Sequence, residues 1–192
     1  PDVSGVRAYC CGLGYGELSV NGCKADDSVL DPAWTNYNQR VLCRTLDVTR
    51  LVQTGDNKAR ILLGDGWMAH NHRYFRPKPP LPWYHEPCFL LNIRVTYRNG
   101  DVEILYPDEE SCRANTSEIL SQNLFDGEEY SAERADELQQ QEAGELLEAD
   151  GWIAPARTEI AGVRRSQLMQ PIRETEVIEP VRIASIQAST YV

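Results

Sequence analysis

The stretch that decides the fold is Glu17-Leu18-Ser19-Val20-Asn21-Gly22-Cys23-Lys24. Polar and apolar residues alternate over Glu17–Val20, which is the period of a strand with one buried face. Asn21-Gly22 then supplies two residues that tolerate positive φ, as the type I′ turn of a two-residue hairpin requires. The pattern predicts an antiparallel hairpin whose return strand begins at Cys23 or Lys24.

Short strand-like runs continue on both sides of this hairpin. Asn99-Gly100 predicts a second hairpin with the same turn chemistry. Arg50–Gln53 is expected to form a single helical turn, capped by Asp47-Val48-Thr49. Many short strands joined by turns predict an all-β, antiparallel β-sandwich. The further strands are expected at Val6–Cys11, Arg40–Leu46, Ala59–Leu63, Cys88–Tyr97, Asp101–Leu105, Ile119–Phe125 and Val177–Ile186.

One segment has a different composition. Residues 133–150 are rich in Glu, Gln, Ala and Leu, which favours a solvated, acidic surface helix inserted into the sandwich. A disordered acidic loop is the alternative, because the segment has few large apolar residues to bury.

The charge distribution excludes some classes of partner. The net charge is −10, and residues 101–150 hold 16 acidic side chains against only Arg113 and Arg134. Nucleic-acid binding requires stripes of Lys and Arg, and anionic membranes attract the same residues. The sequence contains no apolar run near the roughly 20 residues that span a bilayer. We therefore expect neither a nucleic acid nor a membrane as partner.

The six cysteines lack the paired spacing of a zinc site. Reduced cysteines that act as small hydrophobic residues are the favoured interpretation, with disulfides as the alternative. Reduced thiols indicate a cytoplasmic location. The N-terminus shows no signal peptide, although the chain also lacks an initiator Met, so that a leader could have been removed.

No motif in the sequence predicts catalysis. Gly12-Leu13-Gly14-Tyr15-Gly16 lacks the spacing of a dinucleotide-binding loop and more simply lets the chain turn between strands. Carboxylates such as Asp65, Asp108 and Glu128 are too widespread to identify a glycosidase pair. We expect no catalytic residue in this chain, and no enzymatic activity of it alone.

Aromatic residues instead suggest a binding surface. Trp34 and Trp67 flank strand-like runs and are expected in the core. Tyr74, Trp83 and Tyr84 lie in or beside a proline-rich loop, where they could contact a sugar or a neighbouring domain.

Several strings occur in an order that resembles the N-terminal domain of bacterial α-L-rhamnosidases of glycoside hydrolase family 78. The resemblance runs from about Val6 to Val192. It rests on Gly12-Leu13-Gly14-Tyr15, Asn21-Gly22, Leu30-Asp31-Pro32-Ala33-Trp34-Thr35-Asn36-Tyr37, Leu63-Gly64-Asp65-Gly66-Trp67, Asp126-Gly127-Glu128-Glu129-Tyr130 and Gly151-Trp152.

The resemblance implies a jelly-roll sandwich of the galactose-binding type. It implies an accessory domain that packs on or frames a catalytic barrel elsewhere in the polypeptide, in a parent enzyme that hydrolyses α-L-rhamnosides with inversion. Residues 1–172 would form the sandwich, and residues 173–192 would lead into the next domain of the same polypeptide. No cofactor is required by this interpretation.

A second interpretation comes from carbohydrate-binding module family 67, to which related domains are similar. It implies a calcium-dependent L-rhamnose-binding module, with rhamnose-containing glycans as partners. Asp26 and Asp27 would be the calcium ligands, completed by Asn71 and carbonyls of residues 76–82. Trp83, Tyr84, Tyr74, Asn71 and Glu128 are the candidate sugar contacts. Cys112, Ser131 and Glu133 depart from the family pattern and put sugar contacts near residues 108–134 in doubt.

Overall fold

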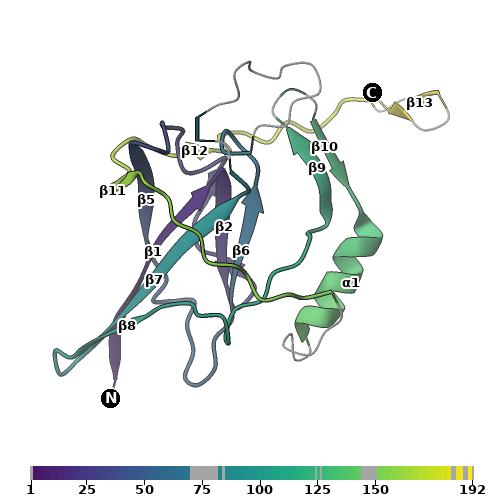
Figure 1. Cartoon of the computed structure of the whole chain (residues 1–192). Helices are drawn as coiled ribbons and strands as arrows, with labels where there is room; N and C mark the ends of the chain where they lie inside the picture. Colours follow the sequence, from purple (N-terminus) through teal and green to yellow (C-terminus); the bar gives the residue numbers. More distant parts are fainter. Residues whose placement is uncertain are drawn as a thin grey trace.

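Two sheets, antiparallel except for one strand pair, pack face to face in the computed structural model (Figure 1). The structure describes residues 2–69, 82–83, 85–123, 125, 127–143, 151–182, 185–187 and 190–191. One sheet has the strand order β11-β5-β1-β7-β8 and the other β3-β2-β6. The predicted all-β sandwich is therefore confirmed. The bounds are β1 Val3–Leu13, β2 Tyr15–Val20, β3 Cys23–Lys24, β5 Arg40–Asp47, β6 Ala59–Gly64, β7 Cys88–Tyr97, β8 Val102–Leu105 and β11 Val163–Ser166.

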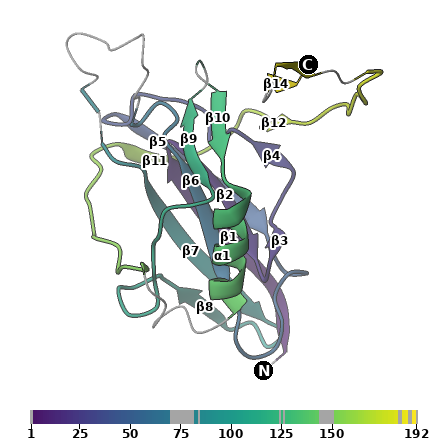
Figure 2. The same ribbon diagram turned by 90° about the vertical axis from the view of Figure 1, so that its right-hand side faces the viewer.

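Smaller elements surround the sandwich. The hairpin of β9 and β10 and the helix α1 lie beside the three-stranded sheet (Figure 2). The predicted acidic helix is confirmed over its described residues, and the Ser131 hydroxyl caps it by accepting a hydrogen bond from the amide of Arg134 (3.2 Å). No helix in the described part of the chain is long and apolar enough to cross a membrane. The bounds are β4 Ser28–Val29, β9 Ile119–Asn123, β10 Gly127–Tyr130, α1 Ala132–Ala143, β12 Ile172–Arg173, β13 Ser185–Gln187 and β14 Thr190–Tyr191.

The two Asn-Gly hairpins use different turns. Asn21 and Gly22 have φ of 50° and 79°, so the first is the predicted type I′ turn. At the second, only Gly100 has positive φ (93°), and its amide donates to the Tyr97 carbonyl at 3.0 Å. The prediction of the same turn chemistry was wrong there. The loop has three residues, a type I turn that ends in a glycine bulge.

Alternation along β1 divides the apolar side chains between two cores. Val6 and Ala8 face the second sheet and form the first cluster with Leu18, Val20, Leu46, Val48 and Leu91. Cys11 and Leu13 point to the opposite face and form the second cluster with Tyr37, Val41 and Met68. Residues 151–162 cover part of this outer face, and Ile160 packs against the second cluster.

Three expectations about elements were wrong in part. Val177 and Ile178 are exposed and lie outside any strand, since Pro180 interrupts the expected strand, and only its last two residues, Ser185 and Ile186, are described as β, in β13. Residues 48–51 form one tight turn, closed by Leu51 N–H donating to Val48 (2.9 Å), in place of a helical turn. The sandwich also contains a parallel pair, β5 with β11, in a segment not expected to form a strand.

Candidate functional site

A close approach of two glycine-rich segments builds one end of the sandwich. Gly14 has φ of 102°, and a Cβ atom placed on it would lie 2.2 Å from the carbonyl oxygen of Gly64. Gly66, on the other segment, has φ of 48°, and a Cβ atom placed on it would lie 2.8 Å from the carbonyl carbon of Gly14. Only glycine satisfies both the conformation and the contact. The turn between β1 and β2 therefore rests directly on the end of β6 and places Trp67 at this end.

A buried polar network holds the loop that carries Trp34. The Asp31 carboxylate is ion-paired with Arg44 and accepts a hydrogen bond from Gln167 Nε2 (2.8 Å). The Oε1 atom of the same glutamine accepts from the amide of Ala33 (2.9 Å). Since Asp31 is only 6% exposed, these contacts compensate the burial of its charge. They fix the backbone on which Trp34 projects outward.

Five aromatic rings meet at this end, and we call them the aromatic cluster: Trp34, Tyr37, Trp67, Trp83 and Phe125. Trp34 lies 5.8 Å from Trp67 and 6.3 Å from Trp83, measured between ring centroids. Trp83 meets Tyr37 at 6.4 Å, and Phe125 meets Trp67 edge-on at 6.5 Å. These spacings are those of favourable tilted and edge-to-face ring pairs.

Hydrogen bonds fix the inner rings of the aromatic cluster. Trp83 Nε1 donates to the Trp67 carbonyl (3.1 Å). Asn38 Nδ2 donates to the Pro82 carbonyl (2.8 Å), which holds the backbone beside Trp83. Burial raises the pKa of the Tyr37 hydroxyl, so this group is neutral at any physiological pH.

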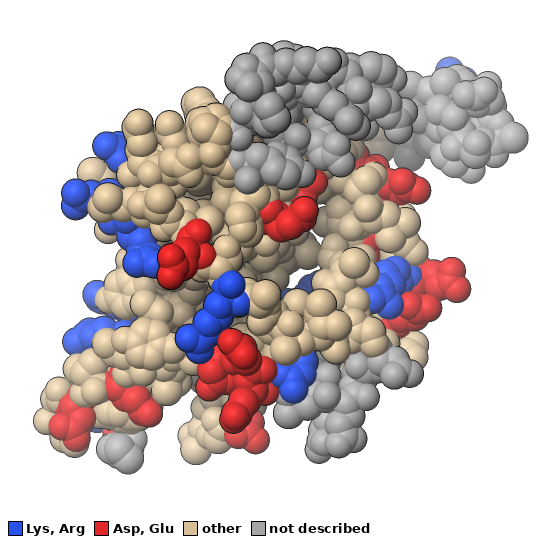
Figure 3. All heavy atoms as spheres, in the orientation of Figure 1, with Lys and Arg blue, Asp and Glu red and all other residues tan. Residues whose placement is uncertain are grey.

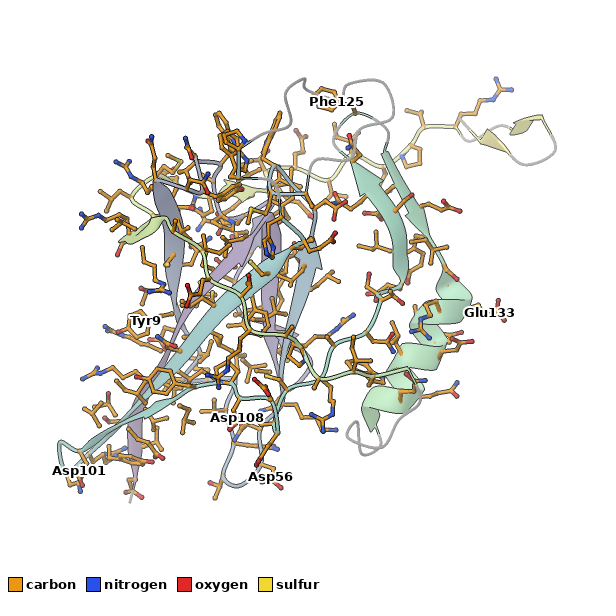
Figure 4. All side chains as sticks on the ribbon, viewed as in Figure 1. Tyr9, Asp56, Asp101, Asp108, Phe125 and Glu133 are labelled. Atoms are coloured by element: carbon orange, nitrogen blue, oxygen red, sulfur yellow. The ribbon has the colours of Figure 1, made fainter. Side chains whose placement is uncertain are left out.

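The outer rings of the cluster remain exposed. Trp34 is 54% and Phe125 is 61% exposed, although both are large and apolar. Phe125 lies at the opposite end of the molecule from the turn at Asp101 (Figure 4). An exposed aromatic surface on a rigid base can stack on the apolar face of a sugar ring or be covered by another domain.

One carboxyl group near the cluster has a perturbed pKa. Burial, and then the negative charge of Glu86, raise the pKa of Asp65 above its ordinary value. The backbone carbonyl of the same residue accepts hydrogen bonds from Met68 and Ala69 (both 3.1 Å), which forms the turn that carries Trp67.

The structure brings one of the predicted sugar contacts into the aromatic cluster. Trp83 belongs to it but is half-buried. Glu128 is an exposed residue of β10, paired in register with Gln122. Asn71, Tyr74 and Tyr84 lie outside the described residues. The set as a whole stays a prediction.

Two aromatic residues correct the sequence-based picture. The prediction that Trp34 lies in the core was wrong, because the network around Asp31 turns its loop outward, whereas Trp67 packs against the second core cluster as expected. Phe125 was missed as a member of the cluster. The signal was available, since an apolar residue followed by Asp126-Gly127 marks the tip of a hairpin.

The proposed calcium ligands are engaged by arginines. Asp26 is ion-paired with Arg44 and accepts from the Ser28 hydroxyl (2.7 Å), and Asp27 accepts from Arg173 Nε (2.6 Å). A nearby guanidinium opposes cation binding, and the described residues contain no group of three or more ligand side chains. These residues alone do not fit calcium. Asn71 and residues 76–82, which were to complete the site, fall outside the described part except for Pro82, so the calcium site stays a prediction.

Comparison with known proteins gives consistent matches. A family model for the α-L-rhamnosidase N-terminal domain matches residues 1–176. An α-L-rhamnosidase from Streptomyces avermitilis is 30% identical over 185 residues, which are 95% of this chain and 16% of that protein. One from Formosa agariphila is 31% identical over 133 residues, which are 68% of this chain and 14% of that protein.

Solved structures give the same result. The α-L-rhamnosidase from Dictyoglumus thermophilum matches with a TM-score of 0.79 at 28% identity, over 99% of this chain and 20% of that one. The Streptomyces avermitilis enzyme, crystallised with L-rhamnose, matches with a TM-score of 0.82 at 25% identity, over 99% of this chain and 18% of that one. The chain thus spans 14–20% of the length of these relatives.

Proposed function

The chain belongs to the α-L-rhamnosidase N-terminal domain family, and from this premise we propose that it is a non-catalytic accessory domain of a larger glycoside hydrolase. Its role is to pack on, or frame, the catalytic part of the same polypeptide. The proposed activity of that larger protein is hydrolysis of terminal α-L-rhamnosides, by analogy with the relatives named above.

The exposed half of the aromatic cluster carries this proposal. Large apolar surfaces left open on a folded domain are typical of interaction sites. A second set of exposed apolar side chains supports the proposal. It lies in the C-terminal part of the chain, which runs along the same end of the molecule in Figure 1, and consists of Leu168, Met169, Ile172, Val177, Ile178 and Val181. A neighbouring domain that covers both surfaces would remove them from water.

The test replaces exposed rings in the longer polypeptide that includes the downstream domains. We expect Trp34→Ala and Phe125→Ala to lower its unfolding temperature and its rhamnosidase activity together, because both rings would be buried at the domain contact. Tyr106→Ala is the matched control, since Tyr106 is 63% exposed and follows β8, at the other end of the sandwich. Equal effects of all three substitutions, or no effect of any, would contradict the proposal.

The aromatic cluster also favours a second candidate, a calcium-dependent L-rhamnose-binding module. Exposed Trp34 and Phe125 on a fixed aromatic base have the composition of a sugar-stacking surface. Calorimetric titration of the chain with L-rhamnose, with calcium and then with chelator, separates the two functions. Saturable heat that is lost with chelator and in the double variant Asp26→Ala/Asp27→Ala supports the binding module. Absence of heat at millimolar sugar supports the accessory domain.

A further inference from the structure

Three of the cysteines lie on one face of the five-stranded sheet. Cys11 of β1 belongs to the second core cluster, and Cys43 of β5 and Cys88 of β7 pack against it. Cys10 lies on the opposite face by the alternation of β1, where it adjoins Arg44. Only Cys11, Cys43 and Cys88 can therefore interact on the outer face.

The register of β1 with β5 runs from Arg7 opposite Asp47 to Cys10 opposite Arg44. Continued by one residue, this register places Cys11 opposite Cys43. The carbonyl of Cys43 accepts a hydrogen bond from the amide of Gln167 (2.9 Å), so its backbone groups point toward β11 and away from β1. Facing residues without mutual backbone hydrogen bonds have Cα atoms about 4.5 Å apart. A disulfide accommodates Cα separations of roughly 4.4–6.8 Å.

The same register excludes other pairings on this face. Cys88 faces Leu13, so it is diagonal to Cys11, at about 7–8 Å, beyond the span of a disulfide. Cys43 and Cys88 are separated by β1, which places them about 9–10 Å apart. Cys11 with Cys43 is the pair that the sheet allows.

Solvent reaches one member of this pair through a small cavity. A cavity of about 70 Å³ is lined by Cys43, Cys88, Thr158 and Arg164, among others, whereas Cys11 is 3% exposed and does not line it. The thiol of Cys11, and then the charge of Arg164, lower the pKa of Cys43. The interaction with Cys43, and then burial, raise the pKa of Cys11. Basic side chains gather on the side of the molecule where β5 and β11 lie (Figure 3).

We propose that Cys43 is a thiol-modification site for small, anionic disulfides, and that Cys11 resolves the adduct into a Cys11–Cys43 disulfide. The Cys43 thiolate attacks one sulfur of the reagent, the reagent S–S bond breaks, and one thiolate leaves and takes up a proton. Cys11 then loses its proton and attacks Cys43, which releases the second thiol. Two protein thiols are oxidised, and one small disulfide is reduced to two thiols.

The first test is made on the unaltered chain. It is incubated with glutathione disulfide, blocked with iodoacetamide and digested with trypsin without reduction. We expect a crosslink between the peptides of residues 8–24 and 41–44, which contain Cys11 and Cys43. Reaction confined to Cys23, the exposed cysteine, or a crosslink that involves Cys88 or Cys112, would overturn the proposal.

Variants then separate the two roles. Cys11→Ser should leave a stable glutathione adduct on Cys43. Cys10 and Cys23 share the tryptic peptide with Cys11, so the peptide masses alone do not identify the crosslinked cysteine. Cys10→Ser and Cys23→Ser are therefore the controls, and both should crosslink like the unaltered chain. A crosslink that persists in Cys11→Ser would overturn the assignment. Circular dichroism checks that each variant is folded. If Cys11→Ser does not fold, the result on the unaltered chain decides the proposal.

A final pair of variants tests the charge at the cavity. Arg164→Gln should slow both reactions, because its charge helps to lower the pKa of Cys43, but it should slow glutathione disulfide by about two- to fivefold more than hydroxyethyl disulfide, which is uncharged. Arg165→Gln is the control, because Arg165 is an equally exposed neighbour that does not line the cavity. Equal slowing with both reagents would contradict the preference for anionic disulfides.

Discussion

At the scale of the residue, Asp65 is a charge that the folded state disfavours. Folding raises the pKa of Asp65 above the ordinary aspartate value of 3.8, so the folded state favours the protonated carboxyl. The stability that this preference contributes is fully present below pH 3.8 and is lost as the pH rises through the pKa of the folded state. Asp65→Asn should therefore stabilise the chain at pH 7, and the gain should vanish below pH 3.8. Thermal unfolding measured over this pH range checks the prediction.

Asp47 provides a control of opposite sign. The Thr49 side chain, and then the Thr49 amide, which donates to Oδ1 (3.0 Å), lower the pKa of Asp47. Asp47→Asn should therefore destabilise the chain at pH 7, with the loss fading as the pH falls through the folded pKa toward acid. Shifts of the same sign in both variants would contradict the roles assigned to these carboxylates.

At the scale of the element, the β1–β2 turn depends on the space left by glycine. Gly14→Ala places a Cβ atom 2.2 Å from a carbonyl oxygen at a φ of 102°, and should lower the free energy of unfolding by at least about 2–3 kcal/mol. Gly55→Ala is the control, because Gly55 also has a positive φ (90°) but has open space around it. Its loss of stability therefore measures the conformational strain without the steric clash. Denaturant unfolding of both variants gives the difference, and equal losses would exclude the clash.

Elements with a local signal were predictable from the sequence. The Asn21-Gly22 turn, the long strands and the acidic helix follow from residue types and period alone. The strands β10, β11 and β12 were not expected, because each is short and forms through a distant or irregular partner. β11 is the clearest case, since Val-Arg-Arg-Ser becomes a strand only because the edge of β5 needs hydrogen bonds.

At the scale of the whole molecule, the sequence indicated an exposed aromatic surface more closely than it indicated which rings form that surface. Aromatic residues crowd into one third of the chain, which pointed to a surface for sugars or a neighbouring domain. Which rings are exposed depends on contacts between residues far apart, such as Gln167 with Asp31 and Ala33. Such contacts leave no local pattern, so Trp34 was placed in the core, whereas Phe125 was missed although Asp126-Gly127 beside it indicates a hairpin tip.

The pairing of β11 with β5 has a consequence for how the chain is made. The ribosome releases β5 well over a hundred residues before β11, which at typical rates of synthesis is on the order of ten seconds. During that interval the outer edge of β5 has no partner from its own chain, and open edges attract other nascent strands. The sandwich is thus completed only once β11 has emerged, and the interval before that is when the nascent domain most needs a chaperone.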